Sequence, residues 1–182
     1  IPIYKNSSSA YACILTDKSS ENRVTVYGGA ASELSGEDIY AIEDKIKTAS
    51  AIVLQNEVSL SANRAACDIA EKHGVMLIIN PAPAVNYDIM LLQKAFVVTP
   101  NEHEAKTIFG VDWKNGMKRV GIKRAVVTMG ANGCAVYENG EVAYIPAAKA
   151  QAVDTTGAGD CFTGALCVKL LEGDTLTDAA KF

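Results

Sequence analysis

The sequence predicts an α/β fold, in which a mostly parallel central sheet is flanked by helices on both faces. Short, nearly continuous apolar runs alternate with helical segments after residue 34, as strands buried on both faces require. Polar and glycine residues gather directly after these runs, where sheets of this class bind their ligands. The chain has 182 residues, of which 49% are apolar and 21% charged, and this suits one packed domain.

The chain begins with a predicted β-hairpin. Residues 12–16 and 23–27 alternate between apolar and polar side chains, and the polar segment 17–22 between them is predicted to form the turn. Ser35 then has the side chain of a helix N-cap, and acidic residues follow it in the first helical turn, where the helix dipole favours them. A helix is therefore expected to start after Ser35.

The remaining elements alternate along the chain. Helices are predicted at residues 61–73, which Gly74 would end, at residues 88–94, after Asp160 and at the C-terminus. Asn139-Gly140 is a turn signal between the last two strands. Strands are predicted at residues 51–54, 75–79, 95–99, 125–129, 134–137 and 141–145.

Charge and composition argue against several classes of protein. Seventeen Lys and Arg against 21 Asp and Glu give a net charge of −4, which is unlike a nucleic-acid-binding surface. The longest apolar runs, such as residues 75–79, are far too short to span a membrane, and no signal-peptide pattern opens the chain. The five cysteines form no C-x-x-C pair, which favours buried thiols in a reducing compartment. We expect a cytoplasmic protein that binds neither nucleic acid nor a membrane.

The most informative segment is Asp154-Thr-Thr-Gly-Ala-Gly-Asp160, which precedes a helical segment. Gly157 and Gly159 allow a tight turn and present unpaired N–H groups at the helix N-terminus, where the helix dipole favours an anion. Asp160 could accept a proton from a hydroxyl held beside that anion. Phosphoryl transfer needs both features. A glycine-rich helix start with an acid in its first turn is the structural alternative, but the five fixed letters occur by chance in about one such chain in 10⁴.

Two other nucleotide-binding patterns do not occur in this sequence. A dinucleotide fingerprint that uses Gly157 and Gly159 would need a third glycine where the chain has Phe162. The pattern G-x-x-x-x-G-K-[ST] is missing as well, so a P-loop enzyme is excluded. Phosphoryl transfer is therefore favoured over nicotinamide-dependent oxidation.

The same segments resemble a known family, the ribokinase-like carbohydrate kinases, also called the phosphofructokinase B family. Residues 154–160 are similar to its second signature, and residues 128–133 to its T-x-G-x-x-G nucleotide loop. Asn101 and Glu104 occupy the matching places of its N-x-x-E segment. Within the family, the ribokinase branch is more similar than the fructokinase and adenosine kinase branches at residues 21–31, 55–57 and 80–83.

The resemblance implies catalytic roles for the residues around the second signature. Asp160 would be the base that takes the proton from the sugar's primary hydroxyl. Glu104 would act through water on the magnesium ion (Mg2+) that accompanies ATP. The γ-phosphoryl group would be held by the N–H groups of Gly157, Ala158, Gly159 and Asp160.

Further binding residues are implied in the same way. Asn101 would contact the phosphates, although it could equally cap the helix that follows. Glu57 would hydrogen-bond the sugar's hydroxyls, although a solvated acid at a strand end is the alternative. Asp154 and the carbonyl of Thr156 would supply part of a site for a monovalent cation (K+). The nucleotide site would be lined by Thr128, Gly130 and Gly133.

The resemblance therefore implies ATP-dependent phosphorylation of a sugar's primary hydroxyl, with ribose converted to ribose 5-phosphate as the first expectation. An adenosine-type nucleoside kinase, another sugar kinase of the family and a non-catalytic nucleotide-binding relative stay open. The small-molecule sugar and ATP would be its partners, with a homodimer as a candidate assembly of the full-length protein. Residues 1–182 would be an incomplete kinase domain, in which the hairpin at 11–30 belongs to the lid on the substrate side.

Overall fold

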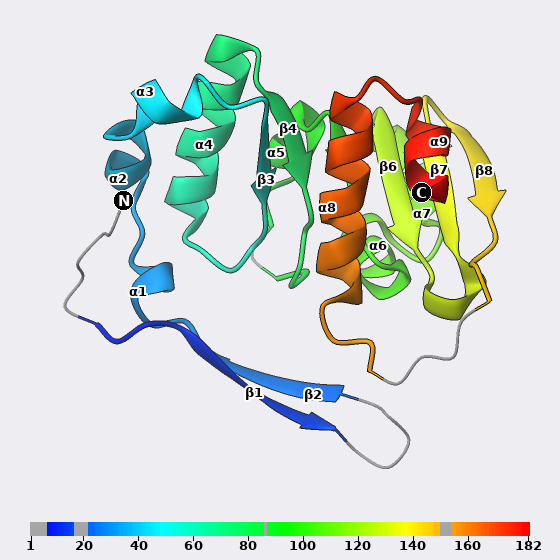
Figure 1. Cartoon of the computed structure of the whole chain (residues 1–182), viewed down its shortest axis with the longest axis horizontal. Coiled ribbons are helices and arrows are strands. Elements are labelled where there is room, and N and C mark those ends of the chain that lie inside the picture. The colour runs from blue at the N-terminus through cyan, green and yellow to red at the C-terminus, as the bar shows by residue number, and fades with distance from the viewer. Residues whose placement is uncertain (1–6, 17–21, 86, 150–153) are drawn as a thin grey trace.

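The computed structural model describes residues 7–16, 22–85, 87–149 and 154–182 (Figure 1). The predicted hairpin is present: β1 (Tyr11–Thr16) pairs antiparallel with β2 (Asn22–Tyr27). Its expected turn falls largely on residues 17–21, outside the described part of the chain. The hairpin is highly exposed, with Leu15 63% and Val26 59% accessible.

A six-stranded sheet forms the centre of the molecule, with the strand order β3-β4-β5-β6-β7-β8. The first four strands are parallel, and the last two are antiparallel to their neighbours. This confirms the predicted mostly parallel sheet. The strands are β3 (Ala51–Leu54), β4 (Met76–Ile79), β5 (Val97–Val98), β6 (Arg124–Thr128), β7 (Cys134–Glu138) and β8 (Glu141–Ile145).

Helices cover both faces of this sheet. Buried residues of α4 to α7 pack on one face, and those of α8 and α9 pack on the other. The helices are α1 (Gly29–Ser32), α2 (Gly36–Tyr40), α3 (Glu43–Ile46), α4 (Leu60–His73), α5 (Ile89–Lys94), α6 (Glu102–Phe109), α7 (Trp113–Arg119), α8 (Ala158–Leu171) and α9 (Leu176–Lys181). A single 3₁₀ turn, η1 (Gly130–Asn132), follows β6.

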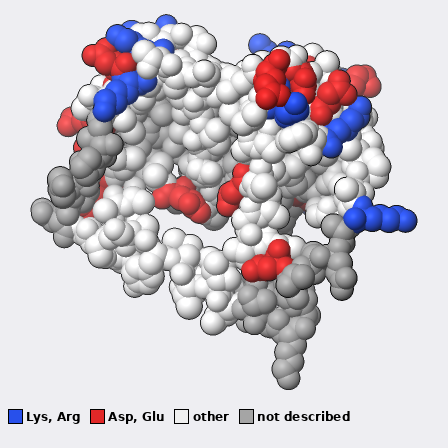
Figure 2. Space-filling view, viewed as in Figure 1, with Lys and Arg blue, Asp and Glu red and all other residues white. Residues whose placement is uncertain are grey.

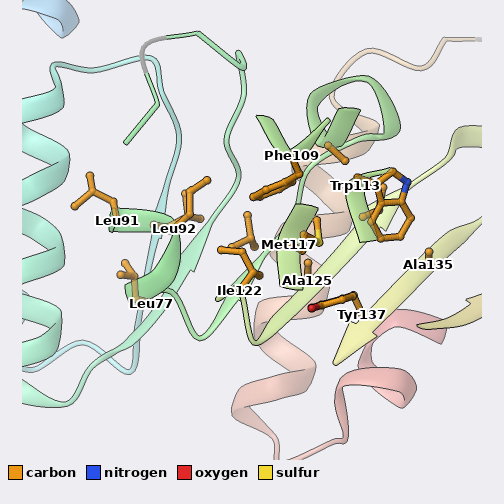
Figure 3. Packing of buried hydrophobic residues seen from close by; sticks show 14 of the residues in the cluster. Leu77, Leu91, Leu92, Phe109, Trp113, Met117, Ile122, Ala125, Ala135 and Tyr137 are labelled. Carbon is orange, nitrogen blue, oxygen red and sulfur yellow. The ribbon is translucent and has the colours of Figure 1, made fainter. Parts of the chain in front are cut away.

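The larger core cluster lies between the sheet and α4 to α7 (Figure 3). Figure 3 shows Leu77 of β4 near Leu91 and Leu92 of α5, while Met117 of α7 lies near Tyr137 of β7. Burial of this apolar surface is the main favourable contribution to folding. The core therefore fixes the sheet from which the loops at its carboxyl edge project.

Local signals in the sequence place several helix ends. Ser35 forms a capping box with Asp38 at the start of α2. Gly74 ends α4 with a φ of 67°, a left-handed conformation that glycine adopts at little cost. Asn139 and Gly140 both have positive φ in the turn between β7 and β8, as predicted.

Three features differ from the expectations. Strand β5 has two residues, because Pro100 follows closely and cannot donate to the ladder. Helix α7 was not anticipated, since Gly116 lies in its middle. The cysteines are not all buried: Cys13 on the hairpin and Cys161 in the first turn of α8 are exposed, because neither position faces a core cluster.

The carboxyl ends of β3 to β6 all point toward the hairpin (Figure 1), which lies across from that edge of the sheet. Helix α8 starts at the same edge and runs back over the sheet. None of the helices in the described ranges is long and apolar enough to cross a membrane.

Candidate active site

A pocket of about 140 Å³ lies at the carboxyl edge of the sheet. It is formed by the loops after β4, β5 and β6 together with the start of α8, so it joins segments from residue 80 to residue 160. Parallel strands end at one edge, and this is why such distant segments meet there. The lining residues are Asn80, Ala82, Thr99, Asn101, Glu104, Thr128, Gly157, Gly159 and Asp160.

Asn101 and Glu104 form a capping box at the start of α6. The Asn101 side chain accepts a hydrogen bond from the Glu104 N–H at 2.8 Å, and Glu104 Oε2 accepts one from the Asn101 N–H, also at 2.8 Å. The N-x-x-E pattern thus has a structural purpose, as the capping alternative predicted. Both residues also line the pocket, so the cap holds them at the candidate site.

Glu104 is the buried carboxylate of the pocket. It is 8% exposed, and burial raises the pKa of its carboxyl above the ordinary value, while the hydrogen bond from Asn101 opposes that rise. A carboxylate oxygen is a hard ligand of the kind that Mg²⁺ takes, usually through one or two carboxylates, waters and substrate phosphates. Its position beside a candidate phosphate site fits the magnesium role that the resemblance implies.

The start of α8 presents N–H groups and a carboxylate to the pocket. Gly157 is the N-cap with a φ of 74°, and no side chain caps the helix. The N–H of Ala158 donates to the Thr155 carbonyl at 3.1 Å, so this predicted donor is engaged within the turn. The N–H groups of Gly159 and Asp160 have no protein partner among the described residues, which is the arrangement of an anion site.

Gly157 also brings the Asp160 carboxylate close. A Cβ built at Gly157 would lie 4.0 Å from Asp160 Oδ2, so the carboxylate lies over the turn that precedes the helix. Asp160 is exposed, and a hydroxyl compound could reach it from solvent. The candidate base Asp160 and the candidate anion site therefore both lie in the first turn of α8.

Asp154 stabilises the loop before α8. Its Oδ1 accepts a hydrogen bond from the Thr156 N–H at 2.8 Å, and this bond and a second one from the Thr156 side chain lower the pKa of the carboxyl. Asp154 and Thr156 can offer a cation a carboxylate and a carbonyl oxygen. Two protein oxygens are too few to hold a monovalent cation, so the potassium site is not complete within the described residues.

Several predicted site residues lie outside the pocket. Gly130 and Gly133 shape the turn around η1: both have positive φ, and a Cβ at Gly133 would lie 2.0 Å from the Ile145 carbonyl. Thr128 precedes this turn and does line the pocket. Glu57 is exposed after β3 and is not among the residues that line this pocket.

Three pocket residues had no predicted role, and two of them, Asn80 and Thr99, are polar. Asn80 follows β4 and is 8% exposed, and its Nδ2 donates to the Thr99 carbonyl at 2.8 Å. Thr99 follows β5 and is 1% exposed. Their positions directly after two strands were visible in the sequence, but no pattern showed that both would turn into the same pocket.

The pocket is acidic. Its charged lining residues are Glu104 and Asp160, and no Lys or Arg of the described chain contributes to it. Figure 2 shows Asp and Glu, without Lys or Arg, along the lower centre of this face between the sheet and the hairpin, whereas charges of both signs are mixed at the upper corners. A phosphate group would meet two carboxylates here, so a cation must accompany it and the N–H groups of α8 must supply the direct contacts.

Comparisons with known proteins agree with this geometry. The chain is 35% identical over 192 residues to a ribokinase of Schizosaccharomyces pombe, covering 98% of this chain and 60% of that protein. A ribokinase structure from Thermotoga maritima superposes with a TM-score of 0.83 at 30% identity, covering 98% of this chain and 61% of the other. An Arabidopsis thaliana ribokinase complexed with ribose and ATP gives a TM-score of 0.80 at 26% identity, with 96% and 60% covered.

The chain thus spans about 60% of the length of the relatives that it matches. The sequence profile described as the pfkB family carbohydrate kinase matches residues 1–182, the full extent of the chain. The segments that form the pocket are the ones that carry the resemblance in the sequence. The chain belongs to the pfkB family of carbohydrate kinases.

Proposed function

We propose that the protein containing this chain transfers the γ-phosphoryl group of ATP to the primary hydroxyl of a sugar, and that this sugar is ribose. The observation that carries this proposal is the pocket that brings Asp160 beside Glu104 and Asn101, next to the α8 N–H groups that have no partner among the described residues. Relatives named ribokinase, one of them complexed with ribose and ATP, support the choice of substrate. The proposed location is the cytoplasm.

In the proposed reaction, the hydroxyl oxygen of the sugar attacks the γ-phosphorus and Asp160 accepts the hydroxyl proton. The bond from the γ-phosphorus to the β,γ-bridging oxygen breaks, and ADP leaves. The N–H groups of Gly159 and Asp160 donate to the phosphoryl oxygens, on which negative charge is held during transfer. Magnesium, when bound with ATP, supplies positive charge next to the phosphates. Glu104 is placed to orient that ion through water, and Asn101 holds Glu104 in position.

The remaining assignments are proposals of the same kind. Thr128 contacts the nucleotide, and the turn that contains Gly130 and Gly133 shapes its site. Glu57 hydrogen-bonds the sugar hydroxyls when the acceptor is bound. Asp154 and Thr156 contribute to a potassium site that the rest of the protein completes.

The proposal is tested with the full-length protein, ATP and magnesium in a coupled assay of ADP release. Ribose, fructose and adenosine are compared as acceptors, and ribose is expected to give the highest kcat/KM. The variant Asp160→Asn should lower kcat by about 10²-fold or more, the range of general-base catalysis, with little change in ATP binding.

Each alternative has a distinct outcome in this assay. A preference for adenosine would show a nucleoside kinase. ATP binding without turnover of any acceptor would favour a non-catalytic relative. Turnover by Asp160→Asn within threefold of the unmodified protein would remove Asp160 from the mechanism.

A further inference from the structure

One pair of hydroxyl groups joins the start of α8 to the sheet. Thr163 lies in α8, Thr99 follows β5, and their Oγ1 atoms are 3.1 Å apart. The two residues are 3% and 1% exposed, so water does not compete for the bond. Among the residues that the structure describes, no other side-chain hydrogen bond connects α8 with the sheet.

The surroundings of this pair are apolar. Ile78, Val97 and Val126 on the sheet face Leu166 in the same buried cluster. Apolar contacts resist separation but have no direction, so they do not by themselves fix the rotation or the axial position of a helix. A hydroxyl–hydroxyl bond depends on distance and direction, usually with its oxygens at about 2.5–3.0 Å, and the 3.1 Å found here lies just beyond that range. A buried hydroxyl without a partner is costly. The pair therefore selects one placement of α8 on the sheet.

The strand side of the pair is firmly held. The Thr99 N–H donates to the Ile79 carbonyl at 2.9 Å, and the Thr99 carbonyl accepts from Asn80 Nδ2 at 2.8 Å. The helix side has fewer anchors, because Gly157 provides no side-chain cap and the first turn is exposed. Thr163 lies three residues after Asp160, so the two side chains leave α8 on the same side.

We propose that Thr163 is a positioning residue, whose hydroxyl bond to Thr99 fixes the first turn of α8 and so holds the Asp160 carboxylate at the pocket lined by Glu104. The inference rests on the proposed function, because it takes Asp160 as the base. Without the pair, the apolar contacts keep α8 on the sheet while its first turn shifts. Turnover should then suffer more than binding, since a small displacement of a reacting group is costly in rate.

The test uses the full-length protein with Thr163→Val, which keeps the shape of the side chain and removes its hydroxyl. We expect kcat for the preferred acceptor to fall about tenfold or more while KM for ATP stays within about twofold. Amide hydrogen exchange should become faster at residues 161–162, the first amides of α8 that are protected by helical hydrogen bonds, such as that from the Cys161 N–H to the Gly157 carbonyl at 2.9 Å. Thr163→Ser keeps the hydroxyl, so its kcat and its hydrogen exchange should match those of the unmodified protein. The matched control, Cys167→Ala at the same interface, should lower the unfolding midpoint and leave kcat unchanged.

Hydrogen exchange needs no substrate, so it separates this inference from the proposed function. If no acceptor is turned over but Thr163→Val, and not Thr163→Ser, still speeds exchange at residues 161–162, the fixing of the first turn stands and the kinase assignment fails. Unchanged exchange and kcat in Thr163→Val would overturn the inference, as would Thr163→Ser being impaired equally. Should Thr163→Val fail to fold, Thr99→Val removes the same pair from the strand side. Because Thr99 itself lines the pocket, this variant is judged by hydrogen exchange in α8 and not by kcat.

Discussion

Glu104 shows how one side chain can serve both the fold and a candidate site. One carboxylate oxygen closes the capping box of α6 through the Asn101 N–H, so the residue stabilises a helix start. Burial at the same time raises the pKa of the carboxyl, which means that its ionised form is less favourable in the folded chain than in the unfolded one. A stability cost of this kind is typical of functional sites.

We predict that Glu104→Gln stabilises the folded protein while lowering its activity. Glutamine can still accept the Asn101 hydrogen bond, so the change removes the charge and keeps the cap. The pKa of Glu104 is higher in the folded chain than its ordinary value of 4.5. The stability of the unmodified protein therefore falls as the pH rises from the ordinary pKa through the higher pKa of the folded chain. Glu104→Gln should therefore have a higher free energy of unfolding than the unmodified protein above this pH range and the same one below it. Urea unfolding at several pH values measures the difference. We expect kcat/KM to fall about 10–100-fold, as for outer-shell metal partners.

The neighbouring Glu102 provides the control. It lies in the same helical turn and forms an exposed ion pair with Lys106 at 2.9 Å. Glu102→Gln should change the unfolding free energy by less than about 1 kcal/mol and leave activity unaltered. Equal activity of the Glu104 and Glu102 variants would contradict the role of Glu104 in binding magnesium.

At the scale of elements, the sequence predicts those parts that depend on local chemistry. The caps at Ser35 and Gly74 and the turn at Asn139-Gly140 follow from residues next to one another, and all three are confirmed. The order of apolar runs likewise predicts the sheet and places the pocket at its carboxyl edge. Membership of the pocket depends instead on how loops turn in space, so no role was predicted for Asn80 and Thr99, and the contact of Glu57 with the sugar stays a prediction.

Helix α7 was missed for a related reason. Glycine has a low helix propensity, so Gly116 argued against a helix at this position. In the fold, a Cβ on Gly116 would lie 2.0 Å from the Phe109 carbonyl, so the close approach of α6 and α7 requires a residue without a side chain. A tertiary contact thus overrides the local preference, and a single sequence does not show such a contact.

We therefore predict that Gly116→Ala destabilises the chain by about 1–3 kcal/mol, the usual cost of overpacking, despite the better helix propensity of alanine. Gly164→Ala is the matched control, because Gly164 lies within α8 and a Cβ added there would meet nothing within 4 Å. That change should stabilise by about 0.5–1 kcal/mol. Urea unfolding with an unchanged m-value measures both effects. A stabilising Gly116→Ala would show that α6 and α7 can separate without cost.

The loop before α8 carries a prediction about the cation. If Asp154 contributes to a potassium site, the full-length enzyme should be faster in potassium than in sodium salts, and Asp154→Ala should abolish that difference. Asp112→Ala is the control, since Asp112 makes the same kind of bond to a backbone N–H, that of Asn115, far along the chain. Equal rates of the unmodified enzyme in both salts would show that the bond from the Thr156 N–H to Asp154 orders the loop without the ion.

At the scale of the whole molecule, the described residues hold the pocket that we propose for phosphoryl transfer. The pocket of about 140 Å³ is smaller than the roughly 300–1,000 Å³ usual for ligand sites, so a nucleotide and a sugar would not both fit within it. Strand β3 is at the edge of the sheet, with Val53 39% exposed. The relatives extend well beyond the matched region, because the chain spans about 60% of their length.

We expect residues 1–182 alone to bind magnesium-ATP weakly and to phosphorylate no sugar, whereas the full-length protein phosphorylates ribose. The acceptor would be held by Asp160 and Glu57 with few other contacts, and each missing hydrogen bond costs about 0.5–1.5 kcal/mol of affinity. Titration calorimetry with ATP and the ADP-release assay on both chain lengths measure this, with circular dichroism and a cooperative unfolding transition establishing that the short chain is folded. Ribose-dependent turnover by a folded 182-residue chain would place the sugar site within the described residues. Tight ATP binding by that chain would show that residues 1–182 are enough to hold the nucleotide.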